Sequence, residues 1–161
     1  MESIVTVTGH GTFNGTQSSY LLSAGWVHHV IITGLQSSTR YSYQCGSAKN
    51  GMSSTYHFTT APPVGSRNEI NLIVYGDEGI FEYSYFTVAH VTELVTKSRL
   101  NIDFIYHLGD YGYGNDRDSM WYEFSWNVFF EQNQLIMTTL PYMTLPGILS
   151  LFFFFLEFYF D

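Results

Sequence analysis

The chain has 161 residues, enough for one ordinary domain or for two partial ones. Its formal net charge of -8, from 14 acidic and 6 basic residues, argues against nucleic acid as a partner, because a surface of this sign repels phosphate backbones. An apolar content of 45% is ample for a core and argues against a disordered chain.

The first part of the chain, residues 1–63, has the pattern of an all-β domain. Short apolar runs alternate with Ser, Thr and Gly turn signals, and the predicted strands are Ile4–Val7, Trp26–Thr33, Arg40–Cys45 and Thr55–Thr60. Residues 34–41 place a Leu, a polar turn and then Tyr41, which suits a sandwich in which a Tyr at the start of a strand caps a loop. We therefore expect a partial β-sandwich whose side chains serve packing.

A few residues of this part are candidates for chemistry or modification. Cys45 cannot form an intrachain disulfide because it is the single cysteine, so it is either a small buried residue or one whose partner was lost by truncation. Asn14 begins an Asn-Gly-Thr glycosylation sequon, which has meaning only in a secreted chain. No signal peptide is visible, and we expect the chain to begin inside a domain. Surface or packing roles are expected for His10, His28, His29 and His57.

After a Pro-containing linker at residues 61–66, the pattern changes to alternating strands and helices. The predicted strands are residues 71–75, 103–107 and 141–145, and the predicted helices are residues 82–99 and 116 to about 134. The apolar face expected for the first helix is Tyr85, Val88, Val91, Leu94 and Val95, and that of the second, capped by Asp116, Asp118 or Ser119, is Trp121, Phe124 and Val128. This order implies an α/β domain with a parallel sheet and right-handed crossovers over residues 64–147.

The tail, residues 148–161, is rich in Phe and has neither helical nor strand periodicity. Its apolar stretch is shorter than the roughly 20 residues that span a bilayer. A membrane anchor, a buried or aggregating strand, and a segment foreign to the fold are the three interpretations, and the third is favoured.

Two Gly-Asp pairs, at Asp77 and Asp110, each follow a predicted strand of the α/β domain. Ligands of open parallel sheets bind beyond the carboxyl ends of the strands, so both carboxylates should lie at one edge. Close carboxylates repel each other, and a bound hard metal ion would offset that repulsion with its positive charge. The alternative is ordinary Gly-Asp turn chemistry.

These segments carry a specific resemblance. Gly76-Asp77-Glu78-Gly79 and Gly109-Asp110-Tyr111-Gly112-Tyr113 resemble the GDxG and GDxxY motifs of purple acid phosphatases, within the calcineurin-like metallophosphoesterases. Residues 141–147 resemble the segment that leads into the GNH motif of this family, and residues 45–47 and 56–62 resemble the end of its fibronectin-III-like N-terminal domain. The resemblance covers residues 3 to 147 in the order of the family.

The resemblance implies a role for each matching residue. Asp77 and Tyr113 would bind a ferric ion, Asp110 would bridge it to a second divalent metal (Fe²⁺, Zn²⁺ or Mn²⁺), and the Tyr113 phenolate would give the purple colour. The implied reaction is phosphomonoester hydrolysis, in a secreted or lysosomal protein.

The match ends after Gly147, where Ile148 and Leu149 occupy the positions of the family's Asn and His. The later VxxH and GHxH motifs lie beyond the chain, and no His follows His107. His107 itself is expected to be a hydrogen-bonded core residue, and His90 to be exposed on its helix. A translated intron or a frame error would explain the change at residue 148.

The leading expectation is an acid phosphatase fragment with half of a dinuclear site and little or no activity. Two rival functions remain: a non-enzymatic β-sandwich interaction module, and a small membrane-associated protein anchored by residues 148–161.

Overall fold

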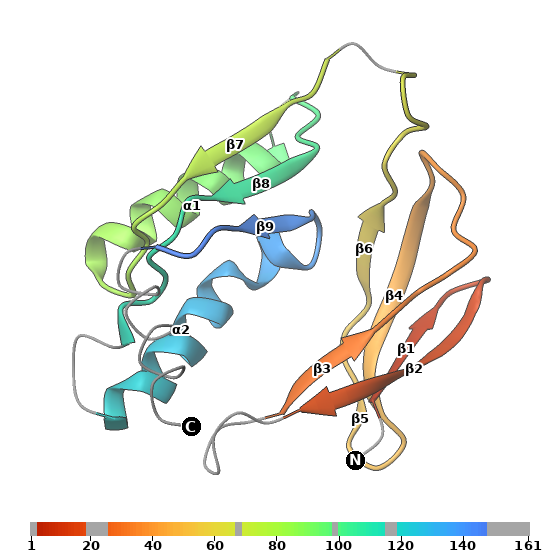
Figure 1. Ribbon diagram of the computed structural model, residues 1–161, viewed down its shortest axis with the longest axis horizontal. Coiled ribbons are helices and arrows are strands. Elements are labelled where there is room, and N and C mark those ends of the chain that lie inside the picture. The colour runs from red at the N-terminus through yellow and green to blue at the C-terminus, as the bar shows by residue number, and fades with distance from the viewer. Residues whose placement is uncertain (1–2, 19–25, 67–68, 98–99, 115–118, 148–161) are drawn as a thin grey trace, which may run out of the picture. The chain divides into compact units, whose positions relative to one another are not determined.

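The computed structural model describes residues 3–18, 26–66, 69–97, 100–114 and 119–147 (Figure 1). The chain divides into two compact units, of which the first ends at Asn68 and the second begins at Glu69. The linker predicted at residues 61–66 therefore falls in the first unit. The tail at residues 148–161 and the proposed helix caps Asp116 and Asp118 lie outside the described residues.

The described part of the first unit is one antiparallel sheet, which confirms the all-β prediction. Strand β1 lies between β2 and β4, β3 flanks β2, and both β5 and β6 pair with β4. The second layer of the predicted sandwich is not seen among the described residues. The strands are β1 (Ser3–Val7), β2 (Gly11–Ser18), β3 (Val27–Val30), β4 (Arg40–Ser47), β5 (Gly51–Met52) and β6 (Tyr56–Thr59).

Strands β2 and β5 were not predicted. The β2 sequence, Gly-Thr-Phe-Asn-Gly-Thr-Gln-Ser, has one large apolar residue and therefore no hydrophobic alternation. It becomes a strand because β1 and β3 supply backbone partners on its two sides. Only the tertiary pairing reveals such a strand, since its own side chains carry little signal.

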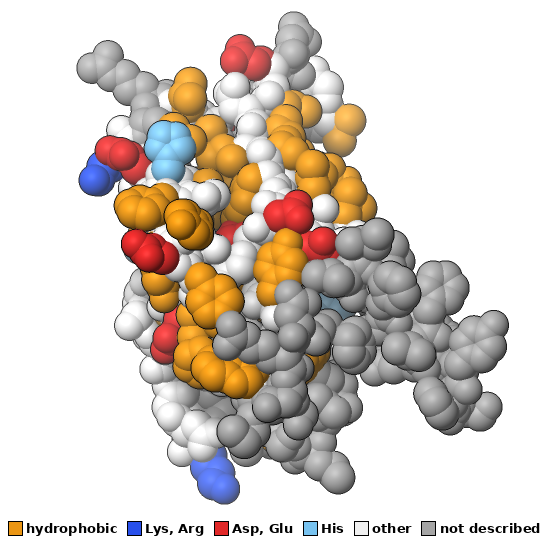
Figure 2. All heavy atoms as spheres, turned by 90° about the vertical axis from the view of Figure 1, so that its left-hand side faces the viewer, with side chains coloured by type: hydrophobic (Ala, Val, Ile, Leu, Met, Phe, Trp, Pro, Cys, Tyr) orange, Lys and Arg blue, Asp and Glu red, His pale blue; other side chains and the backbone are white. Residues whose placement is uncertain are grey.

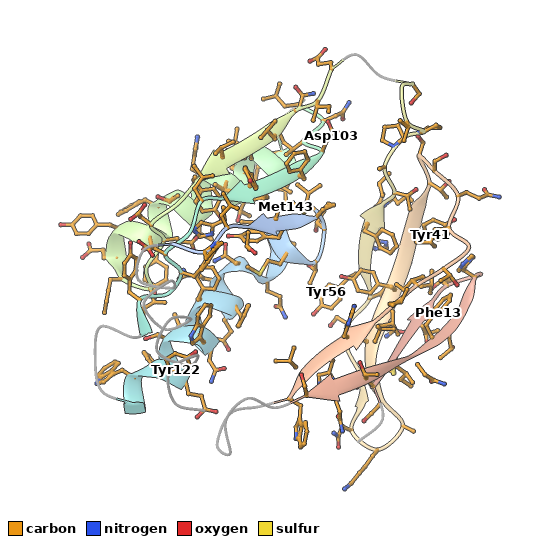
Figure 3. All side chains as sticks on the ribbon, in the orientation of Figure 1. Phe13, Tyr41, Tyr56, Asp103, Tyr122 and Met143 are labelled. Carbon is orange, nitrogen blue, oxygen red and sulfur yellow. The ribbon has the colours of Figure 1, made fainter. Side chains whose placement is uncertain are left out.

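Aromatic rings form a row along one face of this sheet, because alternate residues of a strand point to the same face. The ring centres of Tyr41 and Phe58 lie 5.7 Å apart, and those of Tyr43 and Tyr56 also lie 5.7 Å apart. Figure 3 labels Phe13, Tyr41 and Tyr56 on their strands. The Tyr41 hydroxyl accepts a 2.9 Å hydrogen bond from the Gln36 backbone N–H, so the predicted loop-capping role is confirmed.

The expectation that Cys45 is buried is wrong, because the side chain is exposed. Burial differs from position to position in this sheet: Cys45 is exposed, whereas Ser47, two residues further along β4, is buried. Asn14 is also exposed, on β2 opposite Ile4. The four histidines of this unit are surface residues as expected: His10, His28, His29 and His57.

The second unit alternates strands and helices as predicted. Its three strands pair in parallel in the order β7-β8-β9, with Tyr75 opposite His107 and Ile105 opposite Tyr142. The elements are β7 (Leu72–Tyr75), α1 (Glu82–Lys97), β8 (Phe104–His107), α2 (Ser119–Met137) and β9 (Tyr142–Thr144).

The core lies between this sheet and its two helices. Val88 and Val91 of α1, Ile105 of β8 and Ile136 of α2 form the buried cluster, so both helices cover the same face. On the opposite face, alternate residues remain exposed: Leu72, Val74 and Met143. Figure 2 shows how widely hydrophobic side chains spread over one face of the molecule.

The inward face predicted for α2 is wrong, whereas that of α1 is largely right. Trp121 and Phe124 are 38% and 50% exposed, and the buried residues of α2 are instead Ser125, Phe129, Asn133 and Ile136. Aromatic and apolar residues occur around the whole circumference of α2, so their periodicity did not identify the side that packs. Within the described ranges, neither helix is long and apolar enough to cross a bilayer.

His107 is a fully buried core residue, and His90 is exposed, both as expected. The His107 Nδ1 atom lies 2.7 Å from the Tyr142 hydroxyl, which in turn lies 2.7 Å from the Tyr75 hydroxyl. Burial lowers the pKa of His107 to about 4, against a smaller opposing effect of the Asp77 charge. The imidazole is therefore neutral in the folded protein at ordinary pH.

We predict that Ile136→Ala lowers the free energy of unfolding by about 2–5 kcal/mol, since it opens a cavity in the core. Leu135→Ala is the matched control, because Leu135 is 50% exposed on the adjacent position of α2, and it should cost under about 1 kcal/mol. Denaturant unfolding measures both. Equal losses would contradict the core described here.

We also predict that acid weakens the fold through His107. The unfolded imidazole binds a proton below its ordinary pKa of about 6.5, whereas the folded one does so only near 4. Stability is therefore lost as the pH falls through this window, by up to about 3 kcal/mol from this one group. The unfolding free energy of His107→Phe should fall less steeply across the same pH range. Identical slopes for the two proteins would contradict this effect.

Candidate metal centre

The two Gly-Asp pairs lie side by side at the carboxyl edge of the parallel sheet. The loop after β7 and the loop after β8 continue the sheet pairing, because the Asp77 N–H donates to the Gly109 carbonyl at 3.1 Å and the Glu78 N–H donates to the Asp110 carbonyl at 3.1 Å. Glu78 and Tyr111 form an isolated parallel bridge. The topology thus brings Asp77 and Asp110 to one edge, where the strand–helix pattern placed them.

All three residues predicted as metal ligands have left-handed backbone conformations. The φ angles are 56° at Asp77, 54° at Asp110 and 50° at Tyr113. Asp tolerates this region better than most residues, whereas for a bulky Tyr it is a true outlier. Strain of this kind costs about 1–3 kcal/mol per residue and tends to persist where surrounding structure enforces it, often at functional sites.

The glycines before the two aspartates shape these turns in different ways. Gly109 has a φ of 93° and makes the turn before Asp110. Gly76 has no left-handed φ; its role is close packing, since a Cβ there would lie 3.3 Å from the Leu108 Cβ. At that loop Asp77 itself takes the left-handed conformation.

Tyr113 and Asp77 meet across the two loops. The Tyr113 hydroxyl donates a 2.9 Å hydrogen bond to Asp77 Oδ1. Neighbouring oxygen ligands of an octahedral metal with bonds of about 2.0–2.1 Å are also separated by about 2.9 Å. The spacing of the two oxygens therefore fits joint coordination of one hard cation, with the metal in place of the phenolic proton.

Asp110 contacts the loop that follows β9. A Cβ at Gly147 would lie 2.0 Å from Asp110 Oδ1, so only glycine fits beside this carboxylate. The Tyr111 hydroxyl donates to the Leu145 carbonyl and fixes the same loop. Asp110, on the second loop, thus lies directly against the third loop. Ile148 and Leu149, which follow Gly147, lie outside the described residues.

Two carboxylates and one phenol make up the whole candidate centre. Among the described residues, no three His, Cys, Asp or Glu side chains gather as metal ligands would. The oxygen donors suit a hard cation, and the set lacks the imidazoles that a firm transition-metal site uses. The residues present therefore fit one half of a two-metal centre.

The sequence reasoning missed the role of Glu78, the variable residue of the first motif. Glu78 is only 2% exposed, and its carboxyl group accepts hydrogen bonds from Gln132 and Asn133 of α2. Burial raises the pKa of Glu78, and the hydrogen bonds from Asn133 and Gln132 oppose that rise. The available signal was a pair of adjacent amides, Gln132 and Asn133, in a mainly apolar helix.

A layer of buried hydroxyl groups supports the sheet edge. Burial raises the pKa of Tyr75, Tyr111 and Tyr142, so all three stay protonated at ordinary pH and act as hydrogen-bond partners. Through Tyr142, this layer includes His107. This contact occupies the His107 Nδ1 atom, whereas the buried Nε2 atom has no hydrogen-bond partner among the described residues.

Comparisons with known proteins show which sequences this chain is similar to. Residues 4–60 match the family model described as purple acid phosphatase, N-terminal domain. Probable purple acid phosphatase 20 of Arabidopsis thaliana is 33% identical over 148 residues, which are 88% of this chain and 31% of that protein.

Two further relatives are more distant. Probable inactive purple acid phosphatase 1 of Arabidopsis thaliana is 28% identical over 76% of this chain and 21% of its own length, and acid phosphatase type 7 of Mus musculus is 29% identical over 76% of this chain and 26% of its own length. The chain thus spans between about a fifth and a third of the length of these three relatives. Together, the family match and these alignments show that the chain belongs to the purple acid phosphatase family.

Proposed function

We propose that this chain contributes the first half of the dinuclear metal centre of an acid phosphatase that hydrolyses phosphomonoesters. Asp77 and Tyr113 hold a ferric ion, and Asp110 is shared with a second, divalent ion (Fe²⁺, Zn²⁺ or Mn²⁺). The observation that carries the proposal is the 2.9 Å contact between the Tyr113 hydroxyl and Asp77 Oδ1, across two loops whose candidate ligands are all in left-handed conformations.

Each side chain has a distinct part in this function. Asp77 is exposed, so a metal ion that it held would be accessible to an incoming phosphate anion. Tyr113 is half-buried and would bind the metal as a phenolate, while half-buried Asp110 contacts the third loop at Gly147. When bound, the metal pair supplies a clamp for the phosphate group and an activated water.

The second half of the centre is where this chain departs from its family. By resemblance, positions 148 and 149 should supply Asn and His, and here they are Ile148 and Leu149, which can neither ligate nor donate. We therefore propose that the chain by itself has weak metal affinity and little or no turnover. Secretion or lysosomal targeting, with glycosylation at Asn14, belongs to the same proposal.

Titration of the full chain with ferric iron should produce a visible phenolate-to-iron charge-transfer band. Tyr113→Phe should abolish the band, because it removes the phenolate, and Asp110→Asn should weaken iron binding by tenfold or more, because it removes a charged ligand. Tyr83→Phe is the control, since Tyr83 is 86% exposed on α1, and it should leave the band unchanged. A band that survives Tyr113→Phe would contradict the assignment.

Hydrolysis of an aryl phosphomonoester by the iron-loaded chain should not exceed that of its Asp77→Asn variant. Three oxygen donors retain one metal weakly, and a two-metal clamp needs ligands that the chain lacks. The assay is release of the aryl alcohol, with and without added divalent metal. Turnover that depends on Asp77 would overturn the prediction of an inactive chain and would support a complete centre.

A further inference from the structure

Glu78 lies between the candidate ligands and is attached to both of their loops. Its backbone N–H donates to the Asp110 carbonyl at 3.1 Å, and its own carbonyl accepts from the Gly112 N–H at 2.8 Å. It is also the direct neighbour of Asp77 in the chain. The Glu78 backbone is therefore the point at which the loop after β7 is joined to the loop that carries Asp110 and Tyr113.

The Glu78 side chain fastens this junction to α2. Its Oε1 atom accepts hydrogen bonds from Gln132 Nε2 at 2.8 Å and from Asn133 Nδ2 at 2.5 Å. Gln132 also donates to the Gly79 carbonyl at 3.0 Å, and Asn133, which is fully buried, donates to the Phe129 carbonyl at 3.1 Å. The amides are thus held by the helix backbone and by the loop.

Burying the Glu78 carboxyl group has a desolvation cost, which suggests that the group has a specific role. Removing a carboxyl group from water has a penalty of several kcal/mol, and an apolar pair of similar shape often serves stability as well or better. Hydrogen-bonded partners behind metal ligands, by contrast, orient the ligands, and their loss commonly lowers metal affinity by 10–100-fold. Three strained residues on these loops also need surroundings that enforce their conformation.

We infer that Glu78 is a positioning residue, whose side chain fixes the spacing between Asp77 and the Asp110–Tyr113 loop by anchoring both to α2. The inference rests on the proposed function, because the residues it positions are the proposed metal ligands. It assigns a role to the variable residue of the first motif and to Gln132 and Asn133. Glu78 itself binds no metal and touches no substrate.

The first test measures the junction itself by amide hydrogen exchange of the full chain. Glu78→Leu removes the acceptor and should speed exchange at the Asp77 and Gly112 N–H groups by about tenfold or more, because both donate across the loops. Glu78→Gln keeps an oxygen that accepts the two amide donors, and its rates should stay within about threefold of the original. Val91→Ala in the core of α1 is the control for a general loss of stability.

The outcomes separate clearly. Faster exchange in Glu78→Leu than in Val91→Ala, with rescue in Glu78→Gln, supports the inference. Equal rates in Glu78→Leu and Val91→Ala, or no rescue by Gln, overturn it. Should Glu78→Leu fail to fold, Asn133→Ala replaces it, because this change removes one of the two donors. The Asp77 and Gly112 amides of Asn133→Ala should then exchange faster than those of Val91→Ala. Equal exchange rates in the two variants overturn the inference.

A second test connects the junction to the metal. Gallium(III) is redox-inert and has the charge of ferric iron, so its binding can be followed by the ultraviolet difference spectrum of tyrosine ionisation. Affinity should fall by about 10–100-fold in Glu78→Leu and by under about threefold in Glu78→Gln and Val91→Ala. If the unaltered chain binds no gallium while the exchange result holds, the proposed metal centre fails and the anchoring role of Glu78 stands.

Discussion

The backbone hydrogen bonds between the loop after β7 and the loop after β8 are the interaction on which the candidate centre depends. Parallel pairing of the two strands sets Tyr75 opposite His107, and the pairing then continues through Asp77 and Glu78 into the next loop. Because the loops share this ladder, residues more than thirty positions apart in the sequence bring their oxygen atoms within 2.9 Å. Without these hydrogen bonds between the two loops, nothing would hold Asp77 and Tyr113 close together.

This proximity is maintained against local strain and electrostatic cost. The candidate ligands adopt left-handed backbone conformations, and their two carboxylates carry like charge. The surrounding structure offsets these costs with rigid support: Gly147 lies tight against Asp110, and Glu78 is fastened to α2. A centre that binds a cation gains from such rigidity, since the ligands need not be ordered when the metal enters.

Much of the fold was readable from the sequence, and the errors share one cause. The strand–helix alternation, the shared edge of the Gly-Asp pairs, the Tyr41 loop cap and the buried, hydrogen-bonded His107 followed from local patterns. The exposed Cys45, the unpredicted strand β2 and the packing face of α2 did not. In each of those cases, burial, strand formation or the packing face depends on which other element lies alongside. The local sequence does not show which element that is.

The sequence by itself determined the chemistry that is available: two carboxylates and a phenol in family-like motifs, and Ile148 and Leu149 where donors would be needed. Those are properties of side-chain type and order, so no structure is required to know them. Only the tertiary structure decided that Tyr113 bonds to Asp77, that Asp110 lies against Gly147, and that Glu78 is buried and hydrogen-bonded to α2. These are distances between segments remote in the chain, and strand pairing and helix packing alone set them.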